Sequence, residues 1–245
     1  MNKVKVVVVG NGMVGHKFLE AIVESDQAEK FEITVFCEES RAAYDRVQLS
    51  AYFSGSTADD LSLVTEGFFE KNNIELLLNE KAETIDKASK VITTASGKQV
   101  AYDKLILATG SYPFVPPVPG HERDNCFVYR TIDDLEEITA AAKNAKIGTV
   151  VGGGLLGLEA ANGLMKQGMN VTVVHNLDVL MNRQLDEPAA KMLQASLEER
   201  GLKFKMAAAS KEILGDAHGR VSGITFEDGS ELPADLLVMA VGIRP

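Results

Sequence analysis

The chain has 245 residues, a length that suits two domains of roughly 120 residues each. It carries 25 basic and 35 acidic residues, for a net charge of −10, and no basic cluster, which argues against a nucleic-acid partner. No apolar run reaches the roughly 18 residues that a membrane helix needs, no signal peptide precedes the first strand, and the two cysteines form no C-x-x-C pair. We therefore expect a soluble, reduced, cytoplasmic protein with no membrane or nucleic-acid partner.

Near the N-terminus a predicted buried strand leads into a glycine-rich turn and then a helix. The run VVVVGNGMVG, residues 6–15, places Gly10, Gly12 and Gly15 at G-x-G-x-x-G spacing after four valines. Gly10 suits the tight turn, Gly12 lets the backbone approach a pyrophosphate, and Gly15 lets the helix pack closely on the strand. The helix start supplies free N–H groups and the positive end of its dipole. The spacing alone is a weak signal, but with the flanking strand and helix it indicates a dinucleotide site.

A second predicted strand, residues 32–37, ends beside two carboxylates. In a Rossmann unit an acid at this strand end holds the adenosine ribose by its hydroxyls. Glu38 is the preferred candidate and Glu39 the second choice, because strand ends cannot be placed to one residue from sequence. The alternative is that both are ordinary surface acids at a strand terminus.

The rest of the first half is less regular. Residues 41–53 are polar and poorly periodic, and they would run along the bound nucleotide. We expect short helices at 59–63 and 65–72, a strand at 74–78, alternating strands and turns over 82–108, and a buried strand at 105–108. Four prolines between residues 113 and 119 then form a stiff connector, which predicts two domains, 1–115 and 116–245.

The second domain repeats the strand, glycine turn and helix. Gly152, Gly154 and Gly157 follow the apolar run Ile147–Val151 at the same spacing. Further elements are expected as helices at 132–142, up to 167 and at 187–200, the last closed by Gly201, and as strands at 170–174 and 203–206. Two complete fingerprints predict two bound nucleotides. The fold class is therefore α/β, with two Rossmann-like three-layer dinucleotide-binding domains, each carrying a small antiparallel β-meander.

An internal repeat supports two like domains. Residues 92–113 align without a gap with residues 224–245, at an offset of 132. Eight positions are identical, namely Ile92/Ile224, Thr93/Thr225, Gly97/Gly229, Asp103/Asp235, Leu105/Leu237, Ala108/Ala240, Gly110/Gly242 and Pro113/Pro245. Each copy predicts a hairpin, a turn with an acid, a buried strand and a glycine near the carboxyl edge of the sheet, where doubly wound sheets bind ligands. Coincidence between two short β patterns is the alternative.

Two such units, with strands ending in ATG and AVG, resemble the flavoprotein pyridine-nucleotide oxidoreductases over the whole chain. The resemblance narrows to the N-terminal FAD- and NAD(P)-binding region of the large subunits of NAD(P)H-dependent nitrite reductases. It rests on GNGMVGHKF, FCEESRAAYDRVQLSAYF, ATGSYPFVPP, CFVYRTIDDL, VVGGGLLGLEAANGL and VLMNRQLDE. It implies FAD on the first fingerprint and NADH or NADPH on the second.

The resemblance also implies cofactor-binding roles. On the FAD side the resemblance implies four groups of residues: the glycine fingerprint with the two candidate ribose acids, a segment along the flavin, a backbone contact to the adenine, and a strand end that closes over the dinucleotide. In that order the residues are Gly10, Gly12, Met13, Val14, Gly15, Glu38, Glu39; Arg46, Leu49, Ser50; Ala82; and Ala108, Thr109, Gly110. On the NAD(P)H side they are Gly152, Gly154, Leu155, Leu156, Gly157, His175, Gly242, and Glu159, which would face the nicotinamide. No catalytic side chain and no metal site are expected.

Two departures from related branches bear on the chemistry. Ala51 stands where single-cysteine NADH oxidases and peroxidases carry a cysteine, and no redox cysteine pair follows the ribose acid, so thiol chemistry is disfavoured. In the second domain His175 and Asn176 replace the ribose acid. A carboxylate would repel the 2′-phosphate of NADPH and a neutral pair need not, so the choice between NADH and NADPH stays open. For His175 the alternatives are contact with the ribose or phosphate and a strand-end histidine without a ligand.

A third departure is length. The chain lacks the later segment that completes the FAD domain in this superfamily, and Pro245 is expected to be an engineered or proteolytic boundary. Sirohaem and iron–sulfur clusters are expected only in missing downstream domains, because two cysteines cannot ligate them.

The expected function is therefore to pass electrons from NAD(P)H through FAD to the downstream domains or the small subunit of a nitrite reductase, in nitrate assimilation. The alternatives are a stand-alone NAD(P)H:ferredoxin or rubredoxin reductase, and a nucleotide-binding fragment without catalysis of its own.

Overall fold

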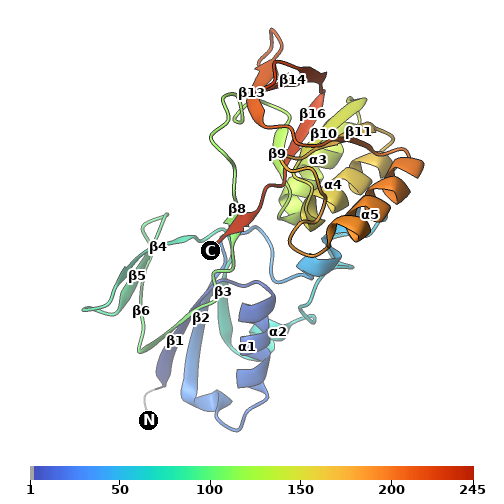
Figure 1. Cartoon of the computed structure of the whole chain (residues 1–245). Helices are drawn as coiled ribbons and strands as arrows, with labels where there is room; N and C mark the ends of the chain where they lie inside the picture. The colour runs from blue at the N-terminus through green and yellow to red at the C-terminus, as the bar shows by residue number, and fades with distance from the viewer. Residues whose placement is uncertain (1–2) are drawn as a thin grey trace. The chain divides into compact units, whose positions relative to one another are not determined.

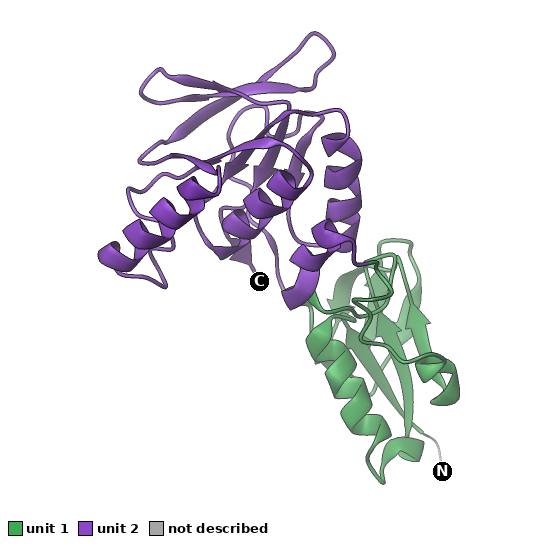
Figure 2. Ribbon diagram, turned by 90° about the vertical axis from the view of Figure 1, so that its right-hand side faces the viewer, with its two compact units in different colours: residues 1–46, 57–110, 245 green, residues 47–56, 111–244 purple. Residues whose placement is uncertain are grey.

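A computed structural model of the chain describes residues 3–245. The chain forms two compact units, which we treat separately (Figure 2). Unit 1 holds residues up to Arg46, residues 57–110 and Pro245, and unit 2 holds residues 47–56 and 111–244. The main division thus follows Gly110, and a short segment of the first half belongs to unit 2.

Unit 1 is built on a four-stranded parallel sheet of order β3-β2-β1-β7. Its strands are β1 (Val4–Val9), β2 (Phe31–Phe36), β3 (Ile74–Leu77) and β7 (Lys104–Leu107). The helices are α1 (Met13–Val23) and α2 (Phe68–Lys71), with a 3₁₀ turn at Ala28–Lys30. An antiparallel sheet is formed by β4 (Ala82–Asp86), β5 (Val91–Thr94) and β6 (Gln99–Ala101).

Alternating side chains of β1 supply both faces of that sheet. Val6 and Val8 pack with Leu19 of α1 and Phe69 of α2 on one face. On the other face Val7 and Val9 pack with β5 and β6, through residues that include Ile92 and Val100. The four valines are therefore covered on both sides, as the apolar run predicts, and Figure 1 shows α1 and the β4–β6 sheet on opposite sides of β1.

Unit 2 has a five-stranded parallel sheet of order β12-β11-β10-β16-β9. Its strands are β9 (Cys126–Val128), β10 (Ile147–Val151), β11 (Asn170–Val174), β12 (Lys203–Lys205) and β16 (Leu236–Met239). The helices are α3 (Ile132–Ala142), α4 (Leu155–Lys166) and α5 (Glu187–Glu199). An antiparallel sheet of β13 (Ser210–Gly215), β14 (Val221–Phe226) and β15 (Glu231–Pro233) covers one face, and β8 (Tyr112–Pro113) pairs with β17 (Ile243–Arg244).

The predicted α/β fold class is confirmed, with one parallel sheet and one three-stranded antiparallel sheet in each unit. The predicted helix at 59–63 is wrong. Asp60 accepts hydrogen bonds from the Thr57 N–H and hydroxyl, at 2.7 and 2.8 Å, and closes a turn there. Residues 58–61 therefore form turns rather than a helix, and Ser62 then pairs with Tyr44 as an isolated bridge.

The irregular residues 41–53 include a 3₁₀ helix, Arg46–Ser54, that the sequence does not predict. Strands β9 and β13 are also additions to the predicted set. Within residues 3–245 no helix is long and apolar enough to cross a bilayer.

Candidate functional site

The first glycine fingerprint lies where β1 passes into α1. Gly10 has a φ of +106°, and a Cβ there would overlap the carbonyl oxygen of Ala108 at the end of β7. A Cβ on Gly15 would overlap the carbonyl oxygen of Gly10. Gly12 differs, because a Cβ there would meet no atom within 4 Å. Gly10 and Gly15 are therefore required by packing, whereas Gly12 leaves open space in front of the helix.

The second fingerprint repeats this geometry in unit 2. Gly152 has a φ of +128°, and its Cβ would overlap the carbonyl oxygen of Ala240. A Cβ on Gly157 would overlap the carbonyl oxygen of Gly152, and Gly154 again faces open space. The two loops thus present the same shape, a closely packed turn with an open middle glycine.

The helix starts at the two loops are left without side-chain caps. Gly12 and Gly154 are the N-cap residues of α1 and α4, no side chain bonds to either helix start, and neither first turn contains an acid. By contrast, α3 has a capping box built on Thr131, and α5 is capped by Asp186. The free N–H groups of α1 and α4 are therefore the ones available to an anion such as a pyrophosphate.

The residues shared by the internal repeat join each fingerprint strand to its neighbour. Asp103 accepts a hydrogen bond from the Lys5 N–H at 2.8 Å, and Asp235 accepts from Lys146 and Ile147 at 2.8 and 2.9 Å. Ala108 donates to the Val9 carbonyl and Ala240 to the Val151 carbonyl, both at 2.8 Å. The repeat is thus a structural joint that brings residues 108–110 and Gly242 to the strand ends beside the glycine loops.

The two candidate ribose acids of unit 1 differ in their surroundings. The side chain of Glu38 is 63% exposed, and its carboxylate lies 3.8 Å from Lys81 Nζ. Glu39 forms an ion pair with Arg46 and accepts a hydrogen bond from the Tyr44 hydroxyl at 2.7 Å. The Arg46 guanidinium also lies 4.8 Å from the centre of the Tyr44 ring. Glu38 is therefore open to a ligand, while Glu39 orients Arg46. Ala82 begins β4 in the same unit.

In unit 2 two predicted residues, Ser50 and Glu159, lie near a tyrosine that the sequence did not single out. Leu49 is buried and Ser50 half-buried in the 3₁₀ helix, and Glu159 is half-buried on α4, where burial raises the pKa of its carboxyl. Tyr129 is 3% exposed and stacks on Phe53, with ring centres 6.2 Å apart. Burial, and then the charge of Glu159, raise the pKa of the Tyr129 phenol. The only sequence signal for Tyr129 is its position in the CFVYRTIDDL motif.

Neither cysteine is poised as a nucleophile. Cys37 is buried at the end of β2, and burial raises the pKa of its thiol. Burial raises the pKa of Cys126 to about 11. Both are free thiols and would be protonated at neutral pH. Among the described residues no group of three or more His, Cys, Asp and Glu side chains could hold a metal ion.

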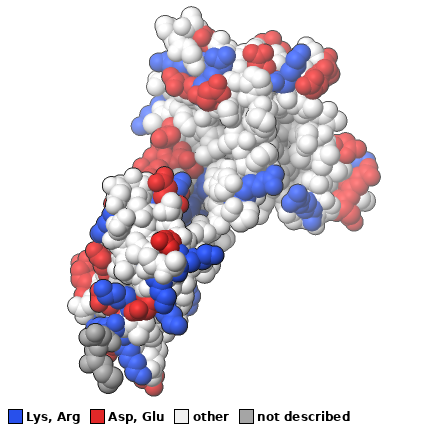
Figure 3. All heavy atoms as spheres, turned by 90° about the vertical axis from the view of Figure 1, so that its left-hand side faces the viewer, with Lys and Arg blue, Asp and Glu red and all other residues white. Residues whose placement is uncertain are grey.

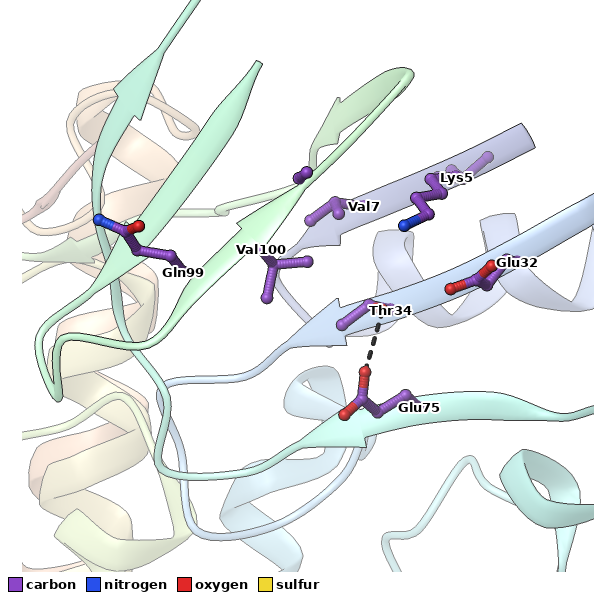
Figure 4. Close-up of a pocket in the computed structure, with 9 residues that line it drawn as sticks. Lys5, Val7, Glu32, Thr34, Glu75, Gln99 and Val100 are labelled. Atoms are coloured by element: carbon purple, nitrogen blue, oxygen red, sulfur yellow. Dashed lines mark hydrogen bonds between the residues drawn. The ribbon is translucent and has the colours of Figure 1, made fainter. Parts of the chain in front are cut away.

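Two hollows in the surface of the described residues lie away from the glycine loops. One, of about 230 Å³, lies over the amino-terminal half of the unit 1 sheet, where the Thr34 hydroxyl donates to Glu75 at 3.1 Å (Figure 4). A second, of about 560 Å³, lies in unit 2 beside β9 and is lined by residues that include Arg123, Glu137 and Arg220. On the face drawn in Figure 3 basic and acidic side chains are interspersed.

Two dinucleotide-binding folds in tandem, each with a packed glycine turn and an uncapped helix, are typical of oxidoreductases that bind two dinucleotides. The chain belongs to the pyridine nucleotide-disulphide oxidoreductase family, whose profile matches residues 4–245. The predicted resemblance to this superfamily is confirmed.

Curated relatives sharpen the comparison. The chain is 48% identical over 245 residues to the nitrite reductase (NADH) large subunit of Escherichia coli (strain K12), covering 100% of this chain and 29% of that protein. It is 50% identical to the nitrite reductase [NAD(P)H] large subunit of Klebsiella oxytoca, covering 100% and 25%. The chain thus spans between a quarter and a third of the length of these two relatives.

Solved structures share the fold. A ferredoxin reductase from Rhodopseudomonas palustris is 28% identical with a TM-score of 0.89, over 98% of this chain and 59% of that one. A NAD-dependent persulfide reductase from A. fulgidus is 29% identical with a TM-score of 0.91, over 98% and 46%.

Proposed function

We propose that this chain is the FAD- and NAD(P)H-binding part of a nitrite reductase large subunit. Unit 1 would bind FAD and unit 2 would bind NADH or NADPH. Electrons would then leave the flavin for iron–sulfur and sirohaem centres, which would lie on downstream domains or on the small subunit. The observation that carries the proposal is the duplicated glycine loop with its uncapped helix start. The 48 and 50% identity to two nitrite reductase large subunits supports the choice of acceptor.

The residues of unit 1 fit an FAD dinucleotide. Open space at Gly12 and the free helix start would accept the pyrophosphate, with Met13 and Val14 in the first turn. The exposed carboxylate of Glu38 would accept hydrogen bonds from the ribose hydroxyls. Glu39 would act indirectly, by holding Arg46. Residues 108–110 would line the same carboxyl edge of the sheet.

The residues of unit 2 fit a nicotinamide dinucleotide in the same way. Gly152, Gly154 and Gly157 would shape the pyrophosphate loop, with Leu155 and Leu156 in the first helical turn. Glu159 lies one turn further along α4, where burial raises the pKa of its carboxyl, and its side chain would face the nicotinamide. We propose that Glu159 and the neighbouring Tyr129 orient the nicotinamide carboxamide.

Flavin supplies the conversion of a two-electron hydride donor into one-electron steps. The work of this chain is to bind and orient, because proximity alone supplies a large part of the rate. Neither thiol has the low pKa that disulfide chemistry requires, so the proposed electron path does not pass through cysteine.

A second candidate is a reductase for a small electron carrier. The chain is 34% identical to the rubredoxin-NAD(+) reductase of Ectopseudomonas oleovorans over 98% of this chain and 62% of that protein. The lower identity makes this the second choice. The two candidates share every binding residue and differ only in the acceptor.

An anaerobic titration tests the proposal. The purified chain is incubated with FAD and desalted, and NADH and then NADPH are added while the flavin absorbance is followed. Stoichiometric bleaching would support bound FAD that accepts hydride from the bound nucleotide. Failure to retain FAD in both this chain and a longer one would contradict the proposal.

A further inference from the structure

The residue between the first two glycines of each fingerprint differs between the units. It is Asn11 in unit 1 and Gly153 in unit 2. Backbone hydrogen bonds fix which neighbours correspond: Gly10 donates to the Phe36 carbonyl at 2.9 Å, and Gly152 donates to the Val174 carbonyl at 2.8 Å. The next residue along each second strand is therefore Cys37 in unit 1 and His175 in unit 2.

In unit 1 the side chain of Asn11 ties down the loop that follows β2. Asn11 is 5% exposed, and its Oδ1 accepts a hydrogen bond from the Ala43 N–H at 2.9 Å. The corresponding strand-end residue is the small Cys37, whose thiol lies 3.4 Å from the Arg41 carbonyl oxygen. The loop is thus held by a side chain from the fingerprint.

In unit 2 the side chain at the strand end contacts the fingerprint residue, which is the reverse of the arrangement in unit 1. The Gly153 N–H donates to Nδ1 of His175 at 3.2 Å, and the Gly153 carbonyl accepts from the Met181 N–H at 2.9 Å. A Cβ on Gly153 would lie 2.7 Å from Cγ and 2.8 Å from Cδ2 of His175, and 2.8 Å from a methyl of Leu180. The imidazole ring therefore occupies the space that a side chain at position 153 would need.

We propose that His175 is a positioning residue for the nucleotide loop of unit 2, where its ring takes the part that the Asn11 side chain plays in unit 1. The inference rests on the proposed function, because the held loop is the one that would bind the NAD(P)H pyrophosphate. It excludes His175 as a ribose or phosphate ligand. Nδ1 is used by Gly153, and Nε2 is buried without a hydrogen bond of normal geometry among the described residues.

The hydrogen bond between the Gly153 N–H and His175 requires a neutral imidazole ring. Nδ1 can accept from Gly153 only when it carries no proton. Burial lowers the pKa of His175, against a smaller opposing effect of the Val179 backbone. The charged side chains of these elements are Asp178, Arg183 and Asp186 in the same loop and Lys203 and Lys205 on β12. Lys205 Nζ lies 3.8 Å from Asp228. Acid would protonate the ring, set two N–H groups against each other and loosen the loop.

Exchanging the two arrangements tests the proposal. The variants are Gly153→Asn, His175→Cys and the double variant, which copies the Asn and Cys pair of unit 1. We expect Gly153→Asn to lower Tm by roughly 5 °C or more, because the new side chain overlaps the ring. His175→Cys should weaken NADH binding about tenfold, because the Gly153 N–H loses its acceptor. The double variant should recover most of both losses, and it should lack the acid weakening of NADH binding that we expect of the wild type.

Each measurement can contradict the inference on its own. A double variant whose Tm loss is the sum of the single losses would show that the ring and residue 153 do not compete for one space. Unchanged NADH affinity in His175→Cys would overturn the role in positioning, even if Gly153→Asn failed to fold. Failure of the wild type to bind NADH would contradict the proposed function instead, and the Tm comparison without nucleotide would still decide the inference.

Discussion

The two units join strand, glycine turn and helix through the same backbone contacts, yet they surround those contacts with different side chains. Gly10 and Gly152 pack on the carbonyls of Ala108 and Ala240 in the same way. The strand ends also match, since Glu80 donates to Cys37 and Ala208 donates to His175, each at 2.9 Å. Because Cys37 therefore corresponds to His175, the next residue, Glu38 of unit 1, corresponds to Asn176 of unit 2.

This comparison separates two kinds of constraint. In the two fingerprints the positions where a Cβ would strike backbone, Gly10/Gly152 and Gly15/Gly157, are glycine in both units, because the packing tolerates only glycine there. Other positions around these loops have diverged, namely Glu38 against Asn176 and Asn11 against Gly153, whereas the open glycines Gly12 and Gly154 are the same in both units. We therefore expect the shared glycines to serve dinucleotide binding in both units, and the diverged positions to decide which dinucleotide each unit binds.

The largest expected effect comes from the packed glycines. Gly15→Ala and Gly157→Ala should each destabilise the protein by about 3 kcal/mol or more, because the added Cβ overlaps a backbone carbonyl. Gly12→Ala and Gly154→Ala are the matched controls and should cost less than about 1 kcal/mol, because their Cβ atoms meet open space. Urea denaturation measures all four. Equal losses of unfolding free energy at the packed and the open glycines would contradict the different roles assigned to them.

An intermediate effect is expected at the diverged ribose position. Asn176→Glu places a carboxylate where unit 1 has Glu38, and should weaken NADPH relative to NADH about tenfold through repulsion of the 2′-phosphate. Asn176→Gln should leave the ratio unchanged. Dissociation constants for both nucleotides give the ratio. An unchanged ratio in Asn176→Glu would show that residue 176 does not face the ribose.

The smallest effect concerns the buried histidine of unit 1. Burial, and to a smaller extent Lys17, lower the pKa of His16 from 6.5, although Glu20 and a Leu63 backbone contact oppose the shift. The unfolded state therefore binds the proton more readily, and stability falls as the pH drops below 6.5. His16→Leu should reduce the Tm loss between about pH 7 and 5 by roughly 2–4 °C.

The exposed His218 supplies the control for that experiment. His218→Gln should leave the acid loss of Tm unchanged. An acid loss as large in His16→Leu as in the wild type would show that His16 does not titrate on unfolding.

The sequence is sufficient for those features that depend on local pattern. The two glycine loops, their strands and helices, and the repeat at an offset of 132 follow from periodicity and spacing, so the α/β class was predictable. The choice between Glu38 and Glu39 was not, because it depends on Arg46 and Tyr44 folding back onto Glu39. The helix expected at 59–63 failed because Asp60 bonds to Thr57, a local competition that periodicity does not report.

Tertiary contacts decide the remaining features. Residues 47–56 lie in the first half of the sequence but pack in unit 2, where Phe53 stacks on Tyr129. The contact of His175 with Gly153 spans 22 residues, and the spacing of the glycine fingerprint does not report it. Such features follow from the fold and not from the order of residues along any one element.

The most direct test of the central claim uses one bulky substitution in each open loop. Gly12→Val and Gly154→Val would fill the space assigned to the FAD and NAD(P)H pyrophosphates, at backbone angles of φ −91° and −89° that valine can adopt. In an anaerobic NADH titration we expect that Gly12→Val lacks the flavin band, and that Gly154→Val keeps the band but resists bleaching. Retention of FAD by Gly12→Val, or normal bleaching of Gly154→Val, would contradict the assignment of one nucleotide to each unit.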